Sequence, residues 1–191
     1  VSKLQKKFRD PLKEIDGNIY NVARQIGISF ILADTIAKNL GEFVYSKHRM
    51  EAALFETLKQ AENKGHSFLC YNELIKRTKV LLKMTAFDYS IAGAVINSEL
   101  LQGTFVIDED RIYLSRLYRA ETKTTKAVIR LANSAIPIQG KLDDMVSFAE
   151  SVCGVTYAPQ QREAFSLLKR GGIGVLTGGP GTGKTTVIKG L

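Results

Sequence analysis

The chain has 191 residues, of which 45% are hydrophobic and 24% are charged, and its formal net charge is +8 at pH 7. This composition is typical of a globular protein with enough apolar residues for one or two small cores. No apolar run approaches the roughly 20 residues of a membrane span, and no signal-peptide pattern begins at Val1. We therefore expect a cytoplasmic protein with no membrane partner, and the positive charge favours nucleic acid as its partner.

The cysteines and histidines give no sign of a metal site or a disulfide. Cys70 and Cys153 are far apart in the sequence, and neither belongs to a C-x-x-C pair. His48 and His66 have no ligand partners at the spacing of a zinc site. We expect both cysteines to be reduced, buried thiols.

The first predicted domain, residues 1–67, begins with two helices that are joined by a tight turn at Gly27. In such a helix-hairpin-helix, the backbone amides of the turn can hold a DNA phosphate without reading the bases. Ser29 replaces the second glycine that is usual in these hairpins, and serine adopts a positive φ less cheaply than glycine. We predict DNA contacts at Gly27 and Ser29, and the alternative is a plain antiparallel helix pair.

A longer helix follows in the same domain. Its apolar residues recur at i, i+3, i+4, i+7, i+8 and i+11 between Met50 and Ala61, so they form one continuous face. Gly65 is placed to end the helix. We expect this face to form part of the core.

The second predicted domain, residues 68–115, contains two helices and then a β-hairpin. Asn72 is placed to cap the first helix, and Gly103 is placed to end the second. The alternation from Phe105 to Leu114 predicts two short strands joined by an acidic turn. We predict a winged-helix-like unit whose acidic wing tip packs against other parts of the protein or separates domains.

The third predicted region, residues 116–150, begins with a basic linker helix. Five cations recur in it at steps of three and four, so they lie along one side of the helix with apolar residues roughly opposite. They are Arg116, Arg119, Lys123, Lys126 and Arg130. We predict that this basic stripe neutralises phosphates of a bound DNA strand. The alternatives are a solvated helix face and docking against an acidic surface.

The fourth predicted region, residues 151–191, contains a helix from Pro159 to Gly171, a buried strand from Ile173 to Thr177 and then the sequence GGPGTGKTT. The loop matches the pattern G-x-x-x-x-G-K-[ST] between a strand and a helix. Its glycines let backbone amides converge on one anion, as in a phosphate-binding loop. Lys184 would reach the β- and γ-phosphates of ATP, and the Thr185 hydroxyl would bind Mg²⁺.

Gln161 lies 23 residues before Lys184. A glutamine amide can donate to and accept from the edge of adenine at the same time, which selects adenine over guanine. We therefore predict that Gln161 reads the base of the nucleotide.

Several of these segments together resemble superfamily 1 DNA helicases of the RecD type. QREAF at 161–165 and the glycine-rich loop resemble the Q motif and motif I of this superfamily. Upstream, GISFILADTIAKNLG, MEAALFETLKQAENKGHSFL and IYLSRLYRAE resemble the helical front end and wing of RecD-like proteins. The resemblance covers nearly the whole chain from about Asp10. It implies that the ATP-binding residues are Gln161, Gly178, Gly179, Pro180, Gly181, Thr182, Gly183, Lys184, Thr185 and Thr186, with Lys184 as the catalytic residue.

The resemblance implies a mainly α fold with a small β-wing, followed by the start of an α/β RecA-like ATPase domain. It further implies an ATP-driven motor that uses Mg²⁺, moves 5′ to 3′ on single-stranded DNA and opens duplex junctions, together with other repair proteins. The expectation is then an N-terminal fragment that ends just after motif I and is inactive alone, because a phosphate-binding loop needs a complete parallel sheet. The alternatives are a DNA-repair ATPase that does not translocate, and a protein-interaction module.

Overall fold

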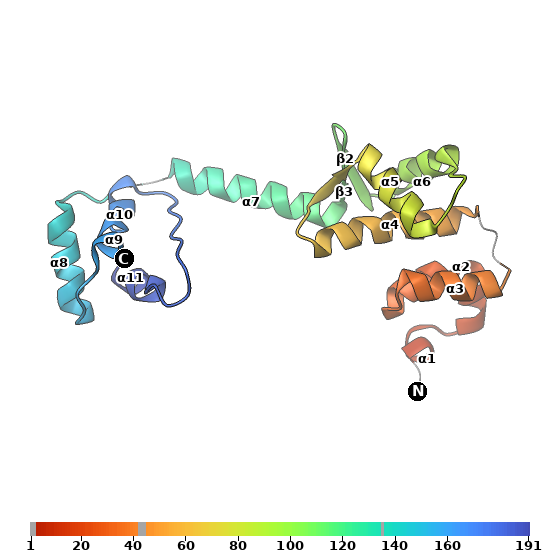
Figure 1. The fold of residues 1–191 in the computed structure, drawn as a ribbon, viewed down its shortest axis with the longest axis horizontal. Coiled ribbons are helices and arrows are strands. Elements are labelled where there is room, and N and C mark those ends of the chain that lie inside the picture. The colour runs from red at the N-terminus through yellow and green to blue at the C-terminus, as the bar shows by residue number, and fades with distance from the viewer. Residues whose placement is uncertain (1–2, 42–44, 135) are drawn as a thin grey trace. The chain divides into compact units, whose positions relative to one another are not determined.

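The computed structural model describes residues 3–41, 45–134 and 136–191. The chain divides into two compact units, residues 1–121 and residues 122–191. The boundary falls within helix α7 (Ser115–Asn133). Within the described ranges, no helix is long and apolar enough to cross a membrane. The structure is mainly helical, with one small antiparallel sheet in the first unit (Figure 1).

The first unit begins with the helical hairpin that the sequence predicts. Helix α1 (Lys3–Lys7) precedes α2 (Pro11–Ile26), which is interrupted by the extended backbone of Asn18. The Asn18 side chain accepts a hydrogen bond from the Asn21 amide at 3.0 Å, so it restarts the helix after the interruption. Helix α3 (Phe30–Asn39) then packs against α2, and the Tyr20 and Phe30 rings stack at 5.9 Å between centroids.

Three further helices complete the core of this unit. They are α4 (Lys47–Asn63), α5 (Tyr71–Leu82) and α6 (Tyr89–Leu101). The predicted apolar face of α4 is confirmed, because every member from Met50 to Ala61 is buried. The Thr78 hydroxyl on α5 lies 3.1 Å from that of Thr57 on α4, so the polar groups at this helix contact satisfy each other. One cluster of buried apolar residues extends from α2 to the sheet.

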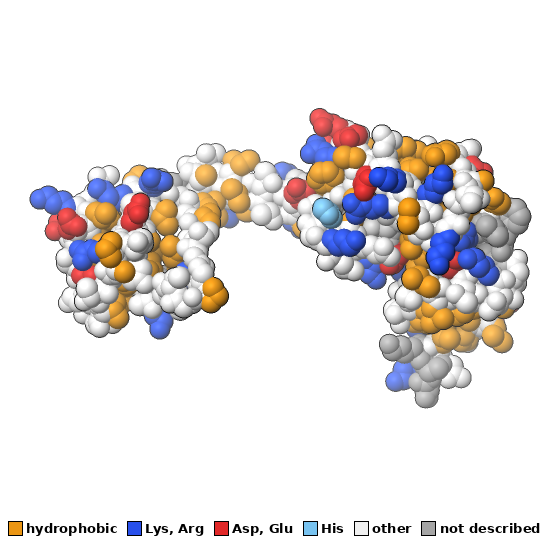
Figure 2. All heavy atoms as spheres, viewed as in Figure 1, with side chains coloured by type: hydrophobic (Ala, Val, Ile, Leu, Met, Phe, Trp, Pro, Cys, Tyr) orange, Lys and Arg blue, Asp and Glu red, His pale blue; other side chains and the backbone are white. Residues whose placement is uncertain are grey.

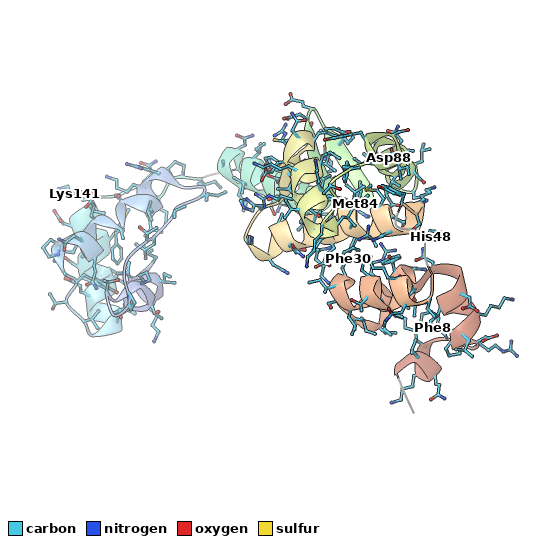
Figure 3. All side chains as sticks on the ribbon, turned by 45° about the vertical axis from the view of Figure 1, so that its right-hand side comes forward. Phe8, Phe30, His48, Met84, Asp88 and Lys141 are labelled. Carbon is cyan, nitrogen blue, oxygen red and sulfur yellow. The ribbon has the colours of Figure 1, made fainter. Side chains whose placement is uncertain are left out.

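A buried ion pair fastens the hairpin to the other helices. Arg49 at the start of α4 donates to both carboxylate oxygens of Asp34 on α3, at 2.6 and 3.0 Å, and also to the Leu82 carbonyl at the end of α5. Tyr20 and Lys38 donate to the same carboxylate. Phe30, at the start of α3, lies on the side of the hairpin that faces α4 (Figure 3). The network therefore joins α2, α3, α4 and the end of α5.

The sheet has three strands, and the sequence predicted only two of them. β2 (Phe105–Asp108) and β3 (Arg111–Leu114) form the predicted hairpin, with Glu109 and Asp110 in the turn. The additional strand is β1 (Phe68–Cys70), which pairs with β3 and gives the strand order β1-β3-β2. It was missed because three residues are too short to show a period, and pairing with β3 alone holds them extended.

Two predictions about neighbouring residues were wrong. The N-cap of α5 is Cys70 rather than Asn72, which lies inside the helix, because β1 leads directly into α5 without a loop. For the same reason Cys70 is exposed at the end of an edge strand rather than buried. Cys153 is half-buried.

The second unit contains four short helices around a separate small core. They are α8 (Leu142–Cys153), α9 (Pro159–Glu163), α10 (Ser166–Arg170) and α11 (Lys184–Gly190). The core consists of Val146, Ala149, Tyr157, Ala164, Phe165 and Val187. Helix α8 was not predicted, and it runs through residue 150, where the third predicted region ends. The single helix predicted from Pro159 to Gly171 is broken into α9 and α10.

Residues 173–177 do not form the predicted strand. Among the described residues no backbone hydrogen bond holds this segment, and the Val175 side chain is 78% exposed. An apolar run becomes a strand only when a neighbouring strand satisfies its backbone groups, and the sheet of the first unit contains only β1, β2 and β3. The described part of the chain therefore offers this segment no partner.

The buried ion pair predicts an acid-sensitive stability. Burial alone would raise the pKa of Asp34, but hydrogen bonds from Arg49, Lys38 and Tyr20 outweigh it and lower the pKa to about 2. The stabilisation is therefore fully present above about pH 4 and is lost as the pH falls to about 2, with a loss of about 2 kcal/mol. Urea unfolding monitored by circular dichroism should show this loss in the wild-type chain.

The substitution Asp34→Asn should lower the free energy of unfolding at pH 7 by about 3 kcal/mol, because it leaves the Arg49 charge buried without its counter-charge. The difference from wild type should narrow between pH 4 and pH 2. Asp16→Asn, at an exposed position of α2, is the matched control and should leave stability nearly unchanged. Equal stability of Asp34→Asn and wild type at pH 7 would contradict this account.

Amide hydrogen exchange should distinguish the buried helix α4 from the unpaired segment 173–177. We expect strong protection across residues 50–62, whose amides are bonded within a buried helix, and exchange within seconds across 173–177. Mass spectrometry of the deuterated chain measures both. Protection of 173–177 that rises with protein concentration would indicate strand pairing between copies, and protection at all concentrations would mean that the segment has been misread.

Candidate functional site

Two glycines of the loop lie close to neighbouring side chains. A Cβ atom at Gly178 would lie 2.7 Å from the Thr182 hydroxyl oxygen, which donates to the Gly179 carbonyl at 2.9 Å, so the Thr182 side chain would have to move. Gly183 has a φ of +78°, and a Cβ there would also meet the Gln161 side-chain nitrogen. The positive φ favours glycine at position 183.

The ammonium group of Lys184 lies over the same loop. Its Nζ atom donates to the carbonyl oxygens of Gly178 and Gly179 at 2.7 and 2.6 Å. In the sequence analysis this lysine is assigned to the β- and γ-phosphates. In the structure it is bonded to the loop itself, and two carbonyl dipoles partly compensate its positive charge. A phosphate that binds here has to displace these oxygens from the ammonium group.

Gln161 contacts the loop in this structure. Its Nε2 atom donates to the Thr182 carbonyl at 3.0 Å, and its Oε1 atom accepts from the Ala158 amide at 2.9 Å. Both polar atoms of the side chain are therefore bonded to backbone groups, and Gln161 ties the start of α9 to the loop. In this conformation Gln161 acts as a positioning residue, and reading adenine would require it to exchange at least one of these bonds.

Residues that the sequence analysis did not single out hold the loop in place. Tyr157 is buried, donates from its hydroxyl to the Thr186 carbonyl at 3.3 Å and packs against Phe165. The Glu150 carboxylate accepts from the Tyr157 amide at 2.8 Å and from Arg162 at 3.2 Å. The sequence offered one signal for these contacts, the aromatic residue two positions before Pro159. An aromatic residue at such a position is too common to predict that it supports the loop.

A cavity of about 340 Å³ opens beside the loop. Lys184, Gly178, Thr182 and Gln161 line it, together with residues 176 and 177, and this size is within the range of small-molecule pockets. Gly179, Pro180, Gly181, Thr185 and Thr186 are exposed around it. Within the described residues no group of three His, Cys, Asp or Glu could hold a metal ion. The Thr185 side chain, which the sequence analysis assigns to Mg²⁺, is exposed near the start of α11.

The hairpin turn in the first unit corrects one expectation. Gly27 has a φ of +77° and ends α2, as predicted, whereas Ser29 has a φ of −65° and carries no strain. Ser29 instead caps α3, because its hydroxyl accepts from the Leu32 amide at 3.4 Å. Serine at this position therefore supports the turn, and the first amides of α3, which have no partner within the helix, lie at the exposed end of the hairpin.

The five cations of the predicted stripe lie on α7 in two different states. Arg116 forms a two-pronged ion pair with Glu62 of α4, and Arg119 donates to the Ser115 hydroxyl at 2.9 Å. Lys123, Lys126 and Arg130 are exposed and have no ion-pair partner in the described part of the chain. Only the second half of the stripe is therefore available to phosphates without breaking an existing bond.

Two comparisons relate the chain to known proteins, one for its first third and one for most of its length. Residues 1–68 match the model of the ATP-dependent RecD2 DNA helicase HHH domain. Over 195 aligned residues the chain is 27% identical to the ATP-dependent RecD2 DNA helicase of Deinococcus radiodurans, and the match covers 94% of this chain and 26% of that protein. The chain therefore spans about a quarter of the length of this curated relative.

The matched range 1–68 contains the hairpin with Gly27 and Ser29. The second match covers nearly the whole chain. Together these findings support a relationship of the chain to the RecD-like helicases.

Proposed function

We propose that the chain is the front part of an ATP-dependent DNA helicase that moves 5′ to 3′ on single-stranded DNA and opens duplex junctions. The single observation that carries this proposal is the match of residues 1–68 to the RecD2 HHH domain model in one chain with a loop of the pattern G-x-x-x-x-G-K-[ST], whose Gly183 has a positive φ. The proposal concerns a protein of about the length of the curated relative, because the remaining helicase motifs are not contained in these 191 residues.

In this proposal the loop holds the triphosphate of ATP. The backbone N–H groups of residues 178–183, except that of Pro180, which has none, would surround the phosphates, and Lys184 would exchange its two carbonyl partners for oxygens of the β- and γ-phosphates. Thr185 would provide one ligand of Mg²⁺, whose remaining ligands would be phosphate oxygens, water and groups from outside this chain. Gln161 would read adenine once it releases the loop.

The DNA would meet the first unit and α7. The exposed amides of the hairpin turn would hold a phosphate, and Lys123, Lys126 and Arg130 would neutralise others. Strand separation by the protein distinguishes this proposal from an ATPase that acts on DNA without translocation. Capture of a partner protein by residues 1–150 in the absence of DNA would favour the interaction-module alternative.

Replacement of Lys184 by alanine tests the nucleotide site. In the full-length protein, Lys184→Ala should lower DNA-stimulated ATP hydrolysis by about a hundredfold or more, because the charge that faces the transferred phosphoryl group is lost. Unwinding of a duplex with a 5′ single-stranded tail should fall with it. A duplex with a 3′ tail should be a poor substrate for the wild-type protein.

The matched control is Lys189→Ala, which removes an exposed lysine from the same helix, α11, without touching the loop. This variant should hydrolyse ATP and unwind DNA as the wild type does. Turnover at the wild-type rate by Lys184→Ala, or unwinding from the 3′ tail alone, would refute the proposed function.

Charge removal on α7 tests the basic stripe. The triple variant Lys123→Ala, Lys126→Ala, Arg130→Ala should weaken DNA binding regardless of sequence and flatten the log–log salt dependence by about one to three units, because fewer counterions are released. Fluorescence anisotropy of labelled oligonucleotides measures both. The control removes the exposed cations Lys141, Lys169 and Arg170 and should leave the slope near that of wild type. Equal slopes of the stripe variant and wild type would favour the solvated-face reading.

A further inference from the structure

A second basic surface of the first unit is formed by residues other than those of the hairpin turn and α7. It is a groove between α4 and α5 with a volume of about 430 Å³, and we call it the α4–α5 groove. Lys64 and His66 line it from the end of α4, and Lys76 and Arg77 line it from α5. Figure 2 shows Lys and Arg side chains gathered over these two helices. Lys83, at the end of α5, extends the positive charge by about 10 Å along the helix axis.

Two lysines of this groove have no ion-pair partner. In the described ranges Lys64 and Lys76 in the groove, and Lys83 beyond its end, are exposed and have no acidic group within ion-pair distance. Two nearby carboxylates are paired with other cations, because Glu73 pairs with Arg77 at 2.6 Å and Glu62 pairs with Arg116. Glu56 accepts a hydrogen bond from the uncharged Gln60 amide at 3.1 Å and keeps its negative charge.

The surfaces that a winged helix would offer to DNA are not basic here. Helix α6, the last helix before the hairpin, contains neither Lys nor Arg, although a recognition helix in the major groove needs donors for bases and phosphates. The wing tip carries Glu109 and Asp110, and Arg111 is paired with Asp108 and Glu109. The cavity at the hairpin turn is lined by both signs of charge, including Glu51 and Glu56. The α4–α5 groove, by contrast, is lined by Lys64, Lys76 and Arg77 and by no carboxylate among the described residues.

The chemistry of the groove suits a phosphate backbone better than a protein. Six of its eight lining residues are polar or charged, and the apolar residues that line it are the aliphatic Val80 and Leu81, with no Phe, Tyr or Trp among the described residues that line it. A protein interface needs a core of apolar and aromatic side chains, which this groove does not supply. A phosphodiester needs only cations and hydrogen-bond donors along its path.

We propose that the α4–α5 groove binds the phosphate backbone of DNA without sequence preference, as a contact additional to the hairpin turn and the α7 stripe. This inference rests on the proposed function, because it extends the DNA path of the same protein. Lys64, Lys76 and Lys83 each neutralise a phosphate, and the side chains of Gln60 and His66 offer further polar contacts. DNA that lies on the groove is held by α4 and α5, which belong to the rigid core of the unit.

The test compares DNA binding by the 191-residue wild-type chain with that of the triple variant Lys64→Ala, Lys76→Ala, Lys83→Ala. The probes are a labelled 20-nucleotide oligothymidylate and a 20-base-pair duplex of mixed sequence, each titrated across a range of salt concentrations. We expect affinity at low salt to fall about 10- to 100-fold and the log–log salt slope to flatten by about two units for the single strand. The larger of the two losses identifies single-stranded or duplex DNA as the preferred form.

Two further variants keep the result interpretable. Lys6→Ala, Lys13→Ala, Lys47→Ala removes the same charge from exposed positions outside the groove and should leave the slope within about half a unit of wild type. Lys64→Arg, Lys76→Arg, Lys83→Arg keeps the charge and should bind as wild type does. All positions are exposed, so circular dichroism should report the same unfolding transition for every variant.

The inference is overturned if the groove variant binds both probes as wild type does, or no more weakly than the charge-matched control does. It is also overturned if the groove captures polyglutamate in preference to either oligonucleotide, which would indicate an acidic protein partner. In these cases the proposed helicase function stands if the full-length protein still unwinds DNA. Failure of the wild-type chain to bind any DNA would count against both the inference and the DNA-binding part of the proposed function.

Discussion

The first unit depends on the ion pair between Asp34 and Arg49. Asp34 comes from the hairpin and Arg49 from the first turn of α4, and both side chains are buried, so neither charge has water to replace its partner. A buried pair of this kind adds little net stability over an apolar contact, but it cannot be broken on one side without a large penalty. It therefore fixes the hairpin on α4 in one arrangement, with Tyr20 and the Leu82 carbonyl completing the hydrogen bonds.

The second unit is organised differently, because its small apolar core supports one loop. Val187 is the only residue of α11 in that core, and Tyr157 and Phe165 pack around it. A second apolar hollow, lined by Ile138, Leu168 and Ile188, stays open on this unit. A loop that exchanges its internal hydrogen bonds for a ligand, as proposed for this one, would benefit from such light support, since few contacts would oppose its rearrangement.

The sequence predicted those elements whose signals are local. The face of α4 from Met50 to Ala61 and the turn at Gly27 follow from helical spacing and from the backbone freedom of one glycine, and the structure has both. The hairpin from Phe105 to Leu114 was equally clear from alternation. The loop could be located from its glycine and lysine spacing, and its nucleotide remains a prediction.

The errors concern features that depend on distant partners. β1 forms because its backbone pairs with β3, with Leu69 opposite Ile112. Residues 173–177 do not form a strand because no described strand pairs with them. The break between α9 and α10 contains no Gly or Pro, so nothing local signals it. The bonds of Gln161 to the loop and of Arg116 to Glu62 were likewise invisible, because each joins residues more than 20 positions apart.

The bonds of Lys184 to Gly178 and Gly179 bear on the choice of anion at this loop. A phosphodiester carries a single negative charge, and a lysine without such bonds in a glycine-rich loop would attract it. An anion that takes over these two donors has to displace both carbonyl oxygens. A triphosphate offers several charged oxygens in return, whereas one phosphodiester offers far fewer. Under the proposed function, the two bonds would therefore favour ATP over the DNA backbone at the loop.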